Sequence, residues 1–360
     1  MKYYNLKNIL TKNAKYNVIY GERSNGKTYA TLKHGIENYV KDGSQIAYVR
    51  RWSEDFTGKR GATLFDSLVM NGEITRITRG EWSSVYYYGS RWFLCRYEDD
   101  KRVTDDKPFC YGFSVSAMEH DKSTSYPYIT TVVFDEFISR SAYIPDEFVL
   151  FMNLLSTIIR ERTNVTIFML GNTVNKYCPY FSEMGLTHVK DMKKGTIDVY
   201  RYGDTELTVA VEYVLPNKDG KASDLYFAFD NPKLSMITGG EWEIDIYPHL
   251  PHKYKPKNVL FTYYIIFGSD ILQCEIINVE NDVFTFIHRK TGDIKHPDTD
   301  IVYTPDYSPR PNYKRKITKP TTKLEKKIAY FYATDKVFYS DNDVGEIVRN
   351  YLIFCGKQNI

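Results

Sequence analysis

The sequence is poor in cysteine and has no long apolar stretch. Its five cysteines are scattered along the chain and odd in number, which argues against a disulfide framework and a zinc site and indicates a reducing compartment. No uncharged run approaches the ~18 residues that a membrane-spanning helix needs, and the first residues lack the apolar core of a signal peptide. We therefore expect a soluble, cytoplasmic protein without a membrane partner.

Excess charge of one sign is also small. The chain carries 48 Lys and Arg against 45 Asp and Glu, a net charge of +3. Bulk charge therefore does not indicate nucleic-acid binding, and any such binding must use local basic patches. No helix-turn-helix, zinc-finger or RNA-binding signature is present, so recognition of a particular base sequence is not expected.

The length of 360 residues is sufficient for two domains of ordinary size. Over the first two hundred residues, short apolar runs alternate with helix-compatible segments, which predicts an α/β domain with a mostly parallel sheet. Charged residues, Pro and Gly are mixed with short apolar runs after that point. We expect a first α/β domain over residues 1–200, a linker or lid subdomain over 201–240, and a smaller α/β domain over 241–360.

The most informative motif is a phosphate-binding loop near the N-terminus. Residues 21–28 read G-x-x-x-x-G-K-[ST], directly after an apolar run and before a helix-compatible stretch. The glycines let backbone N–H groups cradle the α- and β-phosphates, the lysine neutralises the β- and γ-phosphates, and the threonine hydroxyl can sit on Mg²⁺. The motif predicts ATP and Mg²⁺ as ligands, bound by Gly21, Glu22, Arg23, Ser24, Asn25, Gly26, Lys27 and Thr28.

A pair of carboxylates follows a second apolar run. Residues 131–134 are apolar or β-branched, and they end in Asp135 and Glu136, the form of a Walker B strand. We expect Asp135 to hold Mg²⁺ together with Thr28, and Glu136 to orient and deprotonate the attacking water. The second acid favours an ATPase that drives movement over a kinase or GTPase, which have less use for it.

Three further residues are candidates for the reaction. A predicted strand over 165–171 ends beside Asn172, which could contact the γ-phosphate or simply form a turn. Arg23 could fold over the γ-phosphate of its own subunit or lie on the surface of a tight turn. Arg160 and Arg162 end a predicted helix over 145–160, where cations already stabilise the helix dipole; the alternative is a finger that reaches the ATP of a neighbouring subunit.

Two basic clusters could grip phosphates without reading bases. The larger cluster contains Lys314, Arg315 and Lys316 with further lysines up to residue 327, and the smaller one lies at residues 252–257. A solvated linker or helix face is the commoner reason for such runs, so both interpretations stay open.

Taken together, these residues resemble the DNA-packaging ATPases of small short-tailed phages, which belong with large terminases and FtsK/HerA-type ring translocases. The resemblance covers roughly the first 180 residues and returns faintly near 338–352. It rests on residues 21–28, 48–51, 125–127, 133–137, 143–145 and 160–172.

The resemblance implies an ASCE-type P-loop domain and a homo-oligomeric ring, expected to be a pentamer, that pumps double-stranded DNA into a procapsid. The portal, or connector, would be its docking partner, and a structural RNA could join the motor. Such a protein would be found in the host cytoplasm and transiently at the portal vertex. Arg160 matches the position thought to act in trans, and Lys122 falls in a loop that would face the pore and contact DNA.

The second domain would resemble an RNase H-type nuclease. Such nucleases hold two metal ions with a carboxylate cluster, whose first member lies near the middle of the opening strand. The strand expected at 261–267 has no acid, and Asp270 lies beyond it. We therefore expect a vestigial domain that binds DNA or portal and does not cut.

Alternatives remain at this stage. One is a cellular DNA-pumping ATPase of the FtsK/HerA type, and another is a nucleotide-controlled scaffold that hydrolyses little ATP. An active terminase nuclease is a further alternative. The identity of the arginine finger among Arg23, Arg160 and Arg162 also stays open.

Overall fold

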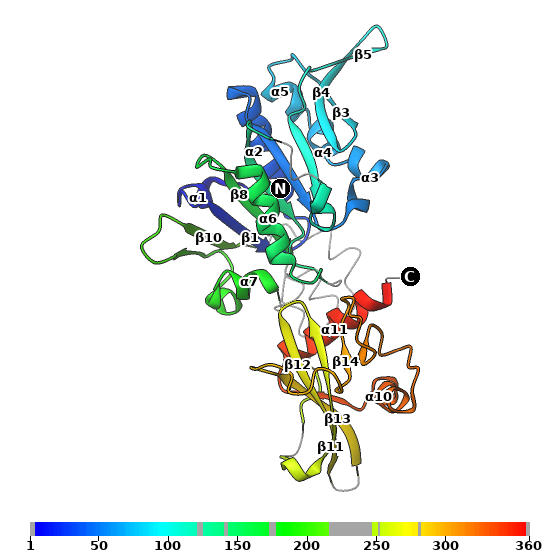
Figure 1. Ribbon diagram of the computed structural model, residues 1–360. Coiled ribbons are helices and arrows are strands. Elements are labelled where there is room, and N and C mark those ends of the chain that lie inside the picture. Colours follow the sequence, from blue (N-terminus) through cyan, green and yellow to red (C-terminus); the bar gives the residue numbers. More distant parts are fainter. Residues whose placement is uncertain are drawn as a thin grey trace, which may run out of the picture. The chain divides into compact units, whose positions relative to one another are not determined.

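The computed structural model describes residues 4–120, 125–139, 143–172, 178–215, 247–250, 253–279 and 282–357. The chain divides into two compact units. The first comprises Met1–Ser139 and Glu147–Glu243, and the second comprises Arg140–Asp146 and Ile244–Ile360. Each unit is built around its own sheet (Figure 1).

A ten-stranded sheet with the order β3-β4-β6-β2-β7-β8-β1-β10-β9, plus β5 beside β4, forms the first unit. The strands from β6 to β10 in this order run parallel to their neighbours, whereas the pairs at both edges are antiparallel. The predicted α/β class with a mostly parallel sheet is confirmed. The strand bounds are β1 Tyr16–Gly21, β2 Gln45–Arg50, β3 Ser84–Tyr88, β4 Arg91–Glu98, β5 Lys101–Thr104, β6 Cys110–Ser114, β7 Ile129–Asp135, β8 Thr166–Asn172, β9 Ile197–Arg201 and β10 Thr208–Tyr213.

Helices cover both faces of the central strands, which explains why consecutive residues of those strands are apolar. Val133 and Phe168 lie in one core with Leu32 and Ile36 of α2 (Lys27–Asp42). On the other face, the ring of Phe134 lies 4.7 Å from that of Phe151 in α6 (Glu147–Ile159). β7 is thus held between two helices, and its last residue is fixed at the sheet edge.

The strand order brings the polar strand ends together. β8 lies between β1 and β7, and its register pairs Gly21 with Asn172 and Leu170 with Asp135. Because the strands are parallel, their carboxyl ends share one edge of the sheet, where ligands of such sheets bind. The phosphate-binding loop, Asp135 and Asn172 therefore meet at this edge.

Short helices complete the first unit. Their bounds are α1 Lys7–Leu10, η1 Ser53–Phe56, α3 Lys59–Ala62, α4 Asp66–Met70, α5 Glu73–Ile77, η2 Val115–His120, α7 Pro179–Glu183 and η3 Thr187–Asp191. The hairpin predicted at 84–94 is present as β3 and β4, which pair through residues 84–95 at the edge of the sheet.

The first unit extends beyond the boundary that we expected at residue 200. β10 pairs in parallel with β1, from Tyr16 opposite Val209 to Tyr20 opposite Tyr213. Residues 208–213 are therefore part of the main sheet and not of a linker, because their apolar run is needed to cover the outer side of β1. Residues 216–240 of the expected linker lie outside the described residues.

The second unit contains a six-stranded sheet of order β15-β14-β11-β12-β13-β16. β11, β12 and β13 form an antiparallel meander, and β14, β15 and β16 add to it in parallel. The helix α11 packs on β11, β13 and β16. The bounds are η4 Pro256–Asn258, β11 Val259–Phe267, β12 Asp270–Val279, β13 Asp282–Arg289, β14 Val302–Tyr303, β15 Tyr313–Lys314, α10 Lys323–Ala333, β16 Val337–Tyr339 and α11 Asn342–Lys357.

Among the described residues of both units, no helix is long and apolar enough to cross a membrane.

Gly35 provides a test of the packing between α2 and β2. A methyl group at this position would fall far inside van der Waals contact with Ile46, which is fully buried. We expect Gly35→Ala to lower the free energy of unfolding by about 1–2 kcal/mol, because overpacking outweighs the better helix propensity of alanine. Denaturant unfolding of the purified variant measures this change.

The double variant Gly35→Ala/Ile46→Val provides the control. Removing the Ile46 δ-methyl makes room for the new methyl group, so the double variant should lose less stability than the sum of the two single variants. Strict additivity would show that the two positions do not compete for space.

Candidate nucleotide-binding site

The phosphate-binding loop has the backbone shape that an anion requires. Ser24 and Gly26 adopt left-handed conformations, with φ of 57° and 91°, and Gly26 is the N-cap of α2. Successive residues in such turns direct backbone N–H groups into a concavity, and the helix N-terminus adds its dipole. The N–H of Tyr4 donates to the carbonyl of Asn25 at 3.0 Å and anchors the loop from outside.

Lys27 is buried at the base of this loop. Only 6% of it is exposed, and its Nζ donates to the carbonyl of Glu22 at 2.6 Å, to Oδ1 of Asn25 at 3.1 Å and to Oδ1 of Asn172 at 3.2 Å. Burial lowers the pKa of Lys27 to about 8, although the nearby Asp135 and Glu22 act in the opposite direction. The ammonium group is thus held by neutral oxygens that a phosphate could replace.

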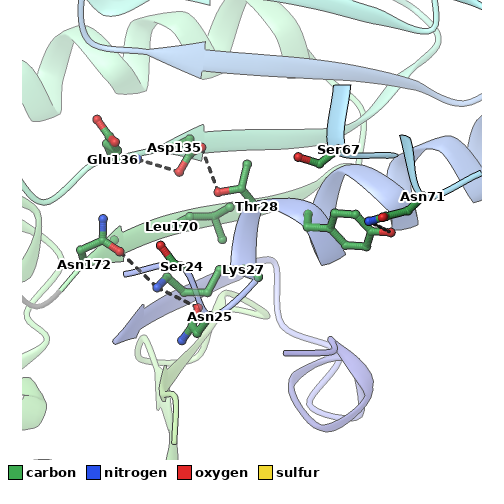
Figure 2. Close-up of a pocket in the computed structure, with 13 residues that line it drawn as sticks. Ser24, Asn25, Lys27, Thr28, Ser67, Asn71, Asp135, Glu136, Leu170 and Asn172 are labelled. Carbon is green, nitrogen blue, oxygen red and sulfur yellow. Dashed lines mark hydrogen bonds between the residues drawn. The ribbon is translucent and has the colours of Figure 1, made fainter. Parts of the chain in front are cut away.

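Asp135 is the acid at the centre of the site. Its Oδ2 accepts hydrogen bonds from the Thr28 hydroxyl at 3.0 Å and from the Tyr48 hydroxyl at 2.9 Å. Burial raises the pKa of Asp135, and the positive charge of Arg50 opposes this shift. Figure 2 shows the Thr28 hydroxyl directed at the Asp135 carboxylate, the arrangement in which the two oxygens could share one cation.

Glu136 is turned away from that pair (Figure 2). Its backbone is left-handed, with φ of 58°, and its Oε2 lies 2.7 Å from Nη2 of Arg50. The same guanidinium lies 3.3 Å from Asp55 and 3.9 Å from Asp135. Since 57% of the Glu136 side chain is exposed, its ion pair contributes at most about 1 kcal/mol and can break readily.

A cavity of about 360 Å³ joins these groups. This volume lies within the range of ligand pockets, ~300–1,000 Å³. Its far end, away from Asn172, is formed by Ser67 of α4 and by Asn71, which directly follows that helix (Figure 2). Tyr29 of α2 also lines the cavity. The full lining is Ser24, Asn25, Gly26, Lys27, Thr28, Tyr29, Ser67, Asn71, Asp135, Glu136, Leu170, Gly171 and Asn172.

The residues present fit a magnesium nucleotide. The Thr28 hydroxyl and the Asp135 carboxylate are hard oxygen ligands of the kind that Mg²⁺ prefers. The ammonium group of Lys27 can bind phosphate oxygens. The amide Nδ2 of Asn25 is buried without a hydrogen-bond partner among the described residues, so the loop holds a donor that the protein itself does not satisfy. The cavity therefore offers cation ligands and anion donors side by side.

Comparison with known proteins assigns the family. The family described as "Podovirus DNA encapsidation protein (Gp16)" matches residues 1–238 of the chain. The chain belongs to this family. The resemblance expected from the sequence is therefore confirmed.

Relatives found by their sequence agree with the family. The "DNA packaging protein" of Bacillus phage B103 is 32% identical over 181 residues, 49% of this chain and 50% of the relative, and that of Bacillus phage phi29 is 29% identical over 195 residues, 53% of this chain and 52% of the relative. These matches span about half the length of the curated relatives.

The fold is shared over a longer stretch. "The Phi-28 gp11 DNA packaging Motor" superimposes with a TM-score of 0.58 at 18% identity, covering 99% of each chain. "The bacteriophage Phi-29 viral genome packaging motor assembly" gives 0.55 at 21% identity, covering 97% of this chain and 99% of that one. At these identities the likeness shows the fold alone.

Most of the predicted nucleotide-site residues of this family member lie around the one cavity. Lys27, Thr28, Asp135, Glu136 and Asn172 all line it. Their roles in binding and hydrolysis remain predictions. Arg23 is exposed and does not line the cavity, so a place for it over the γ-phosphate would require its side chain to move.

Arg160 lies at the opposite end of the strands. The chain reaches it at the end of α6, two residues before Arg162, whose Nη1 donates to the carbonyl of Ile129 at the start of β7. Asp135 ends the same strand, so about 20 Å of β-strand separates the two ends at ~3.3 Å per residue. Arg160 is exposed there and cannot serve the cavity of its own subunit.

Arg162 has a structural environment. Its guanidinium donates to the carbonyls of Tyr126, Pro127, Ile129 and Ile158 at 2.6–3.1 Å. It thus joins the end of α6 to the start of β7, and these bonds leave it poorly suited to reach another subunit.

The predicted DNA contacts fall elsewhere. Lys122 lies outside the described residues. Lys314, Arg315 and Lys316 belong to the second unit and are half-buried, and Nζ of Lys314 lies 3.4 Å from the Glu325 carboxylate. Part of this basic cluster is therefore neutralised within its own unit.

Sequence reasoning missed Tyr48, Arg50 and the far end of the cavity. Tyr48 and Arg50 enter the sequence analysis only through the resemblance of residues 48–51 to the family. A polar residue at the end of a buried strand could have indicated a place at the carboxyl edge of the sheet. Ser67 and Asn71 carry no motif, and only tertiary packing brings them to the cavity.

The lowered pKa of Lys27 predicts how stability depends on pH. Below pH 8 this lysine is charged in both the folded and the unfolded protein, and its burial destabilises the fold. Between about pH 8 and its ordinary pKa of 10.5, the folded side chain loses its proton while the unfolded one keeps it, so the destabilisation shrinks. We expect nucleotide-free Lys27→Met to be more stable than the natural protein by about 1–3 kcal/mol at pH 7, with the difference diminishing towards pH 10.

Denaturant unfolding of both proteins at pH 7, 8, 9 and 10 measures this difference. Other groups titrate equally in the two proteins and cancel. A stability difference that does not change with pH would mean that Lys27 keeps an ordinary pKa in the fold.

Proposed function

We propose that this protein is an ATP-driven translocase that packages double-stranded viral DNA into a procapsid through its portal. The observation that carries the proposal is the meeting of Lys27, Thr28, Asp135 and Glu136 at one cavity in a member of a DNA encapsidation family. A loop for phosphates, a carboxylate for a cation and a second carboxylate for a base are the parts that ATP hydrolysis needs.

Nucleotide binding would follow from the groups at the carboxyl edge of the sheet. The loop N–H groups and Lys27 would hold the phosphates, and Thr28 and Asp135 would hold Mg²⁺, which when bound neutralises charge on the phosphate oxygens. Lys27 would then exchange the Glu22 carbonyl and Asn172 for phosphate oxygens. Asn172, released from Lys27, would be free to contact the γ-phosphate side of the cavity.

Glu136 is the proposed base. In the arrangement described above, its carboxylate pairs with Arg50 and points away from Thr28. Its carboxylate would have to leave Arg50 and turn toward Thr28 and Asp135 before it could accept a proton from a water beside the γ-phosphate. The exposed position of the pair supports such a movement, because little free energy is lost when it opens.

Assembly into a ring is part of the proposal. Arg160 lies about a strand length, ~20 Å, from the cavity of its own subunit, so it could act only at the site of a neighbour. We propose a homo-oligomeric ring, a pentamer, that docks on the portal from the host cytoplasm, with a structural RNA as an optional component. Lys122 and the Lys314–Lys316 cluster remain its proposed DNA contacts.

The second unit is proposed to be an RNase H-type domain without nuclease activity. Its support is the strand arrangement, in which parallel strands β14 and β15 extend an antiparallel meander from the side of β11. β11 carries no acid, and Asp270 forms an ion pair with Arg289. The described residues include no group of three or more His, Cys, Asp or Glu that could hold a metal ion. We propose that the unit binds DNA or portal.

ATP hydrolysis with and without non-specific double-stranded DNA tests the proposal. We expect DNA to stimulate turnover, and we expect Lys27→Ala and Glu136→Gln each to reduce it at least ~100-fold, since one removes phosphate binding and the other the base. Glu37→Gln, an exposed acid of α2 outside the cavity, should leave turnover unchanged. The next experiment would be a DNA-packaging assay with portal-bearing procapsids.

The opposite outcomes have distinct meanings. Turnover that neither substitution reduces would place hydrolysis outside this cavity. A protein that forms rings on DNA but does not hydrolyse ATP would be a nucleotide-controlled scaffold, and turnover coupled to DNA movement without any dependence on portal would indicate a cellular type of DNA pump.

A further inference from the structure

A second arginine, next to Arg50, is buried behind the acid pair. Nε of Arg51 lies 2.7 Å from Oε2 of Glu147, the first residue of α6. Its Nη2 donates to the carbonyl of Phe137 at 2.8 Å and its Nη1 to the carbonyl of Glu136 at 3.3 Å. One guanidinium therefore holds the carbonyls of two successive residues, Glu136 and Phe137.

This arginine and its partner are shielded from water. Arg51 is 5% exposed and Glu147 is 1% exposed. The other carboxylate oxygen of Glu147 accepts from the hydroxyl of Tyr180 in α7 at 2.9 Å. Buried charges of this kind persist only when each is paired and hydrogen-bonded, and a guanidinium can satisfy several acceptors in a fixed planar geometry. Replacing it with a lysine would keep the charge and lose that geometry.

Arg51 joins the backbone at Glu136 and Phe137 to Glu147, and these residues lie at the two ends of the connection between β7 and α6. After Glu136 and Phe137 the chain leaves the first unit, residues 143–146 belong to the second unit, and the chain returns to the first unit at Glu147. Within the second unit, Tyr143 is buried and its N–H donates to Oδ1 of Asn350 at 3.3 Å. The acid Glu136 is thus linked through a short stretch of chain to residues held by another unit.

The conformation at Glu136 requires such support. A left-handed backbone is uncommon for glutamate, and it persists where surrounding contacts over-determine it. The carbonyl of this strained residue accepts a hydrogen bond from Nη1 of Arg51. Fixing this carbonyl fixes the direction in which the Glu136 side chain leaves the strand.

We propose that Arg51, together with Glu147, is a positioning residue for Glu136. It holds the backbone of the proposed base in its left-handed conformation and ties it to the start of α6. This role rests on the proposed function, because positioning a base matters only if Glu136 acts in hydrolysis. Arg51 itself does not line the nucleotide cavity, so it acts through Glu136 and not on the nucleotide.

The test compares Arg51→Lys with the natural protein in DNA-stimulated ATP hydrolysis. We expect kcat to fall at least tenfold while KM and the affinity for a fluorescent ATP analogue change less than threefold. In the Glu136→Gln background, adding Arg51→Lys should cause no further loss, since the group that it positions is already inactive. A role in stability alone would not produce this dependence on Glu136.

Thr78→Val is the control for stability. Thr78 is also buried, and its hydroxyl donates to the backbone carbonyl of Ile74 at 2.9 Å, outside the nucleotide cavity. This substitution should lower the unfolding midpoint as Arg51→Lys does, without lowering kcat. If Arg51→Lys does not fold, Glu147→Gln replaces it, because the amide keeps the shape and the bond to Tyr180 while it removes the charge that holds Arg51.

Each outcome decides between the explanations. A natural kcat in folded Arg51→Lys or Glu147→Gln overturns the positioning role and leaves the proposed function intact. If Arg51→Lys lowers kcat by the same factor with and without Glu136→Gln, the positioning role is also overturned, since the effect would not pass through Glu136. Absence of turnover in the natural protein with DNA overturns both proposals.

Discussion

The constraint on which this structure depends is the burial of opposite charges at the carboxyl edge of one parallel sheet. Lys27 and Asp135 are both withdrawn from water, which lowers the pKa of the lysine and raises that of the acid. Neither charge is tolerable without compensation, because ions in a low-dielectric interior are strongly destabilising. The two strands beside β7 end in polar residues at this edge, β2 in Arg50 and β8 in Asn172.

Most of these groups are paired with one another. Asn172 after β8 and the loop carbonyls hold Lys27, whereas Tyr48 and Thr28 hold Asp135, and Arg50 pairs with Glu136. The proposed magnesium nucleotide would bring its own cation and anions to the same place. Binding would exchange one set of partners for another, and the weak, exposed pair of Glu136 is the one most easily given up.

The parts of this site that the sequence predicts are local in the chain. The phosphate-binding loop and the acid pair are contiguous motifs whose residue types follow from their chemistry, and the parallel strands that carry them follow from their apolar runs. Tyr48, Arg50 and Arg51 were harder to assign, because their partners lie about 85 residues or more away along the chain. Only the pairing of β2 with β7 brings them to the acids.

The domain boundary shows the same limit. β10 has an apolar run as any strand does, and nothing in its own residues indicates that it pairs with β1 at the far side of the sheet. The connection at 143–146, which belongs to the second unit although both flanking segments belong to the first, likewise follows from tertiary contacts and not from composition.

The most direct test of the account is calorimetric titration of ATP into the natural protein and into Asp135→Asn, each with and without Mg²⁺. We expect the natural protein to bind ATP at least tenfold more tightly with Mg²⁺, and we expect Asp135→Asn to lose this dependence, because the buried carboxylate next to Thr28 is the proposed metal ligand. ATP affinity that is the same with and without Mg²⁺ in the natural protein, or a metal dependence that Asp135→Asn retains, would contradict the assignment of this cavity.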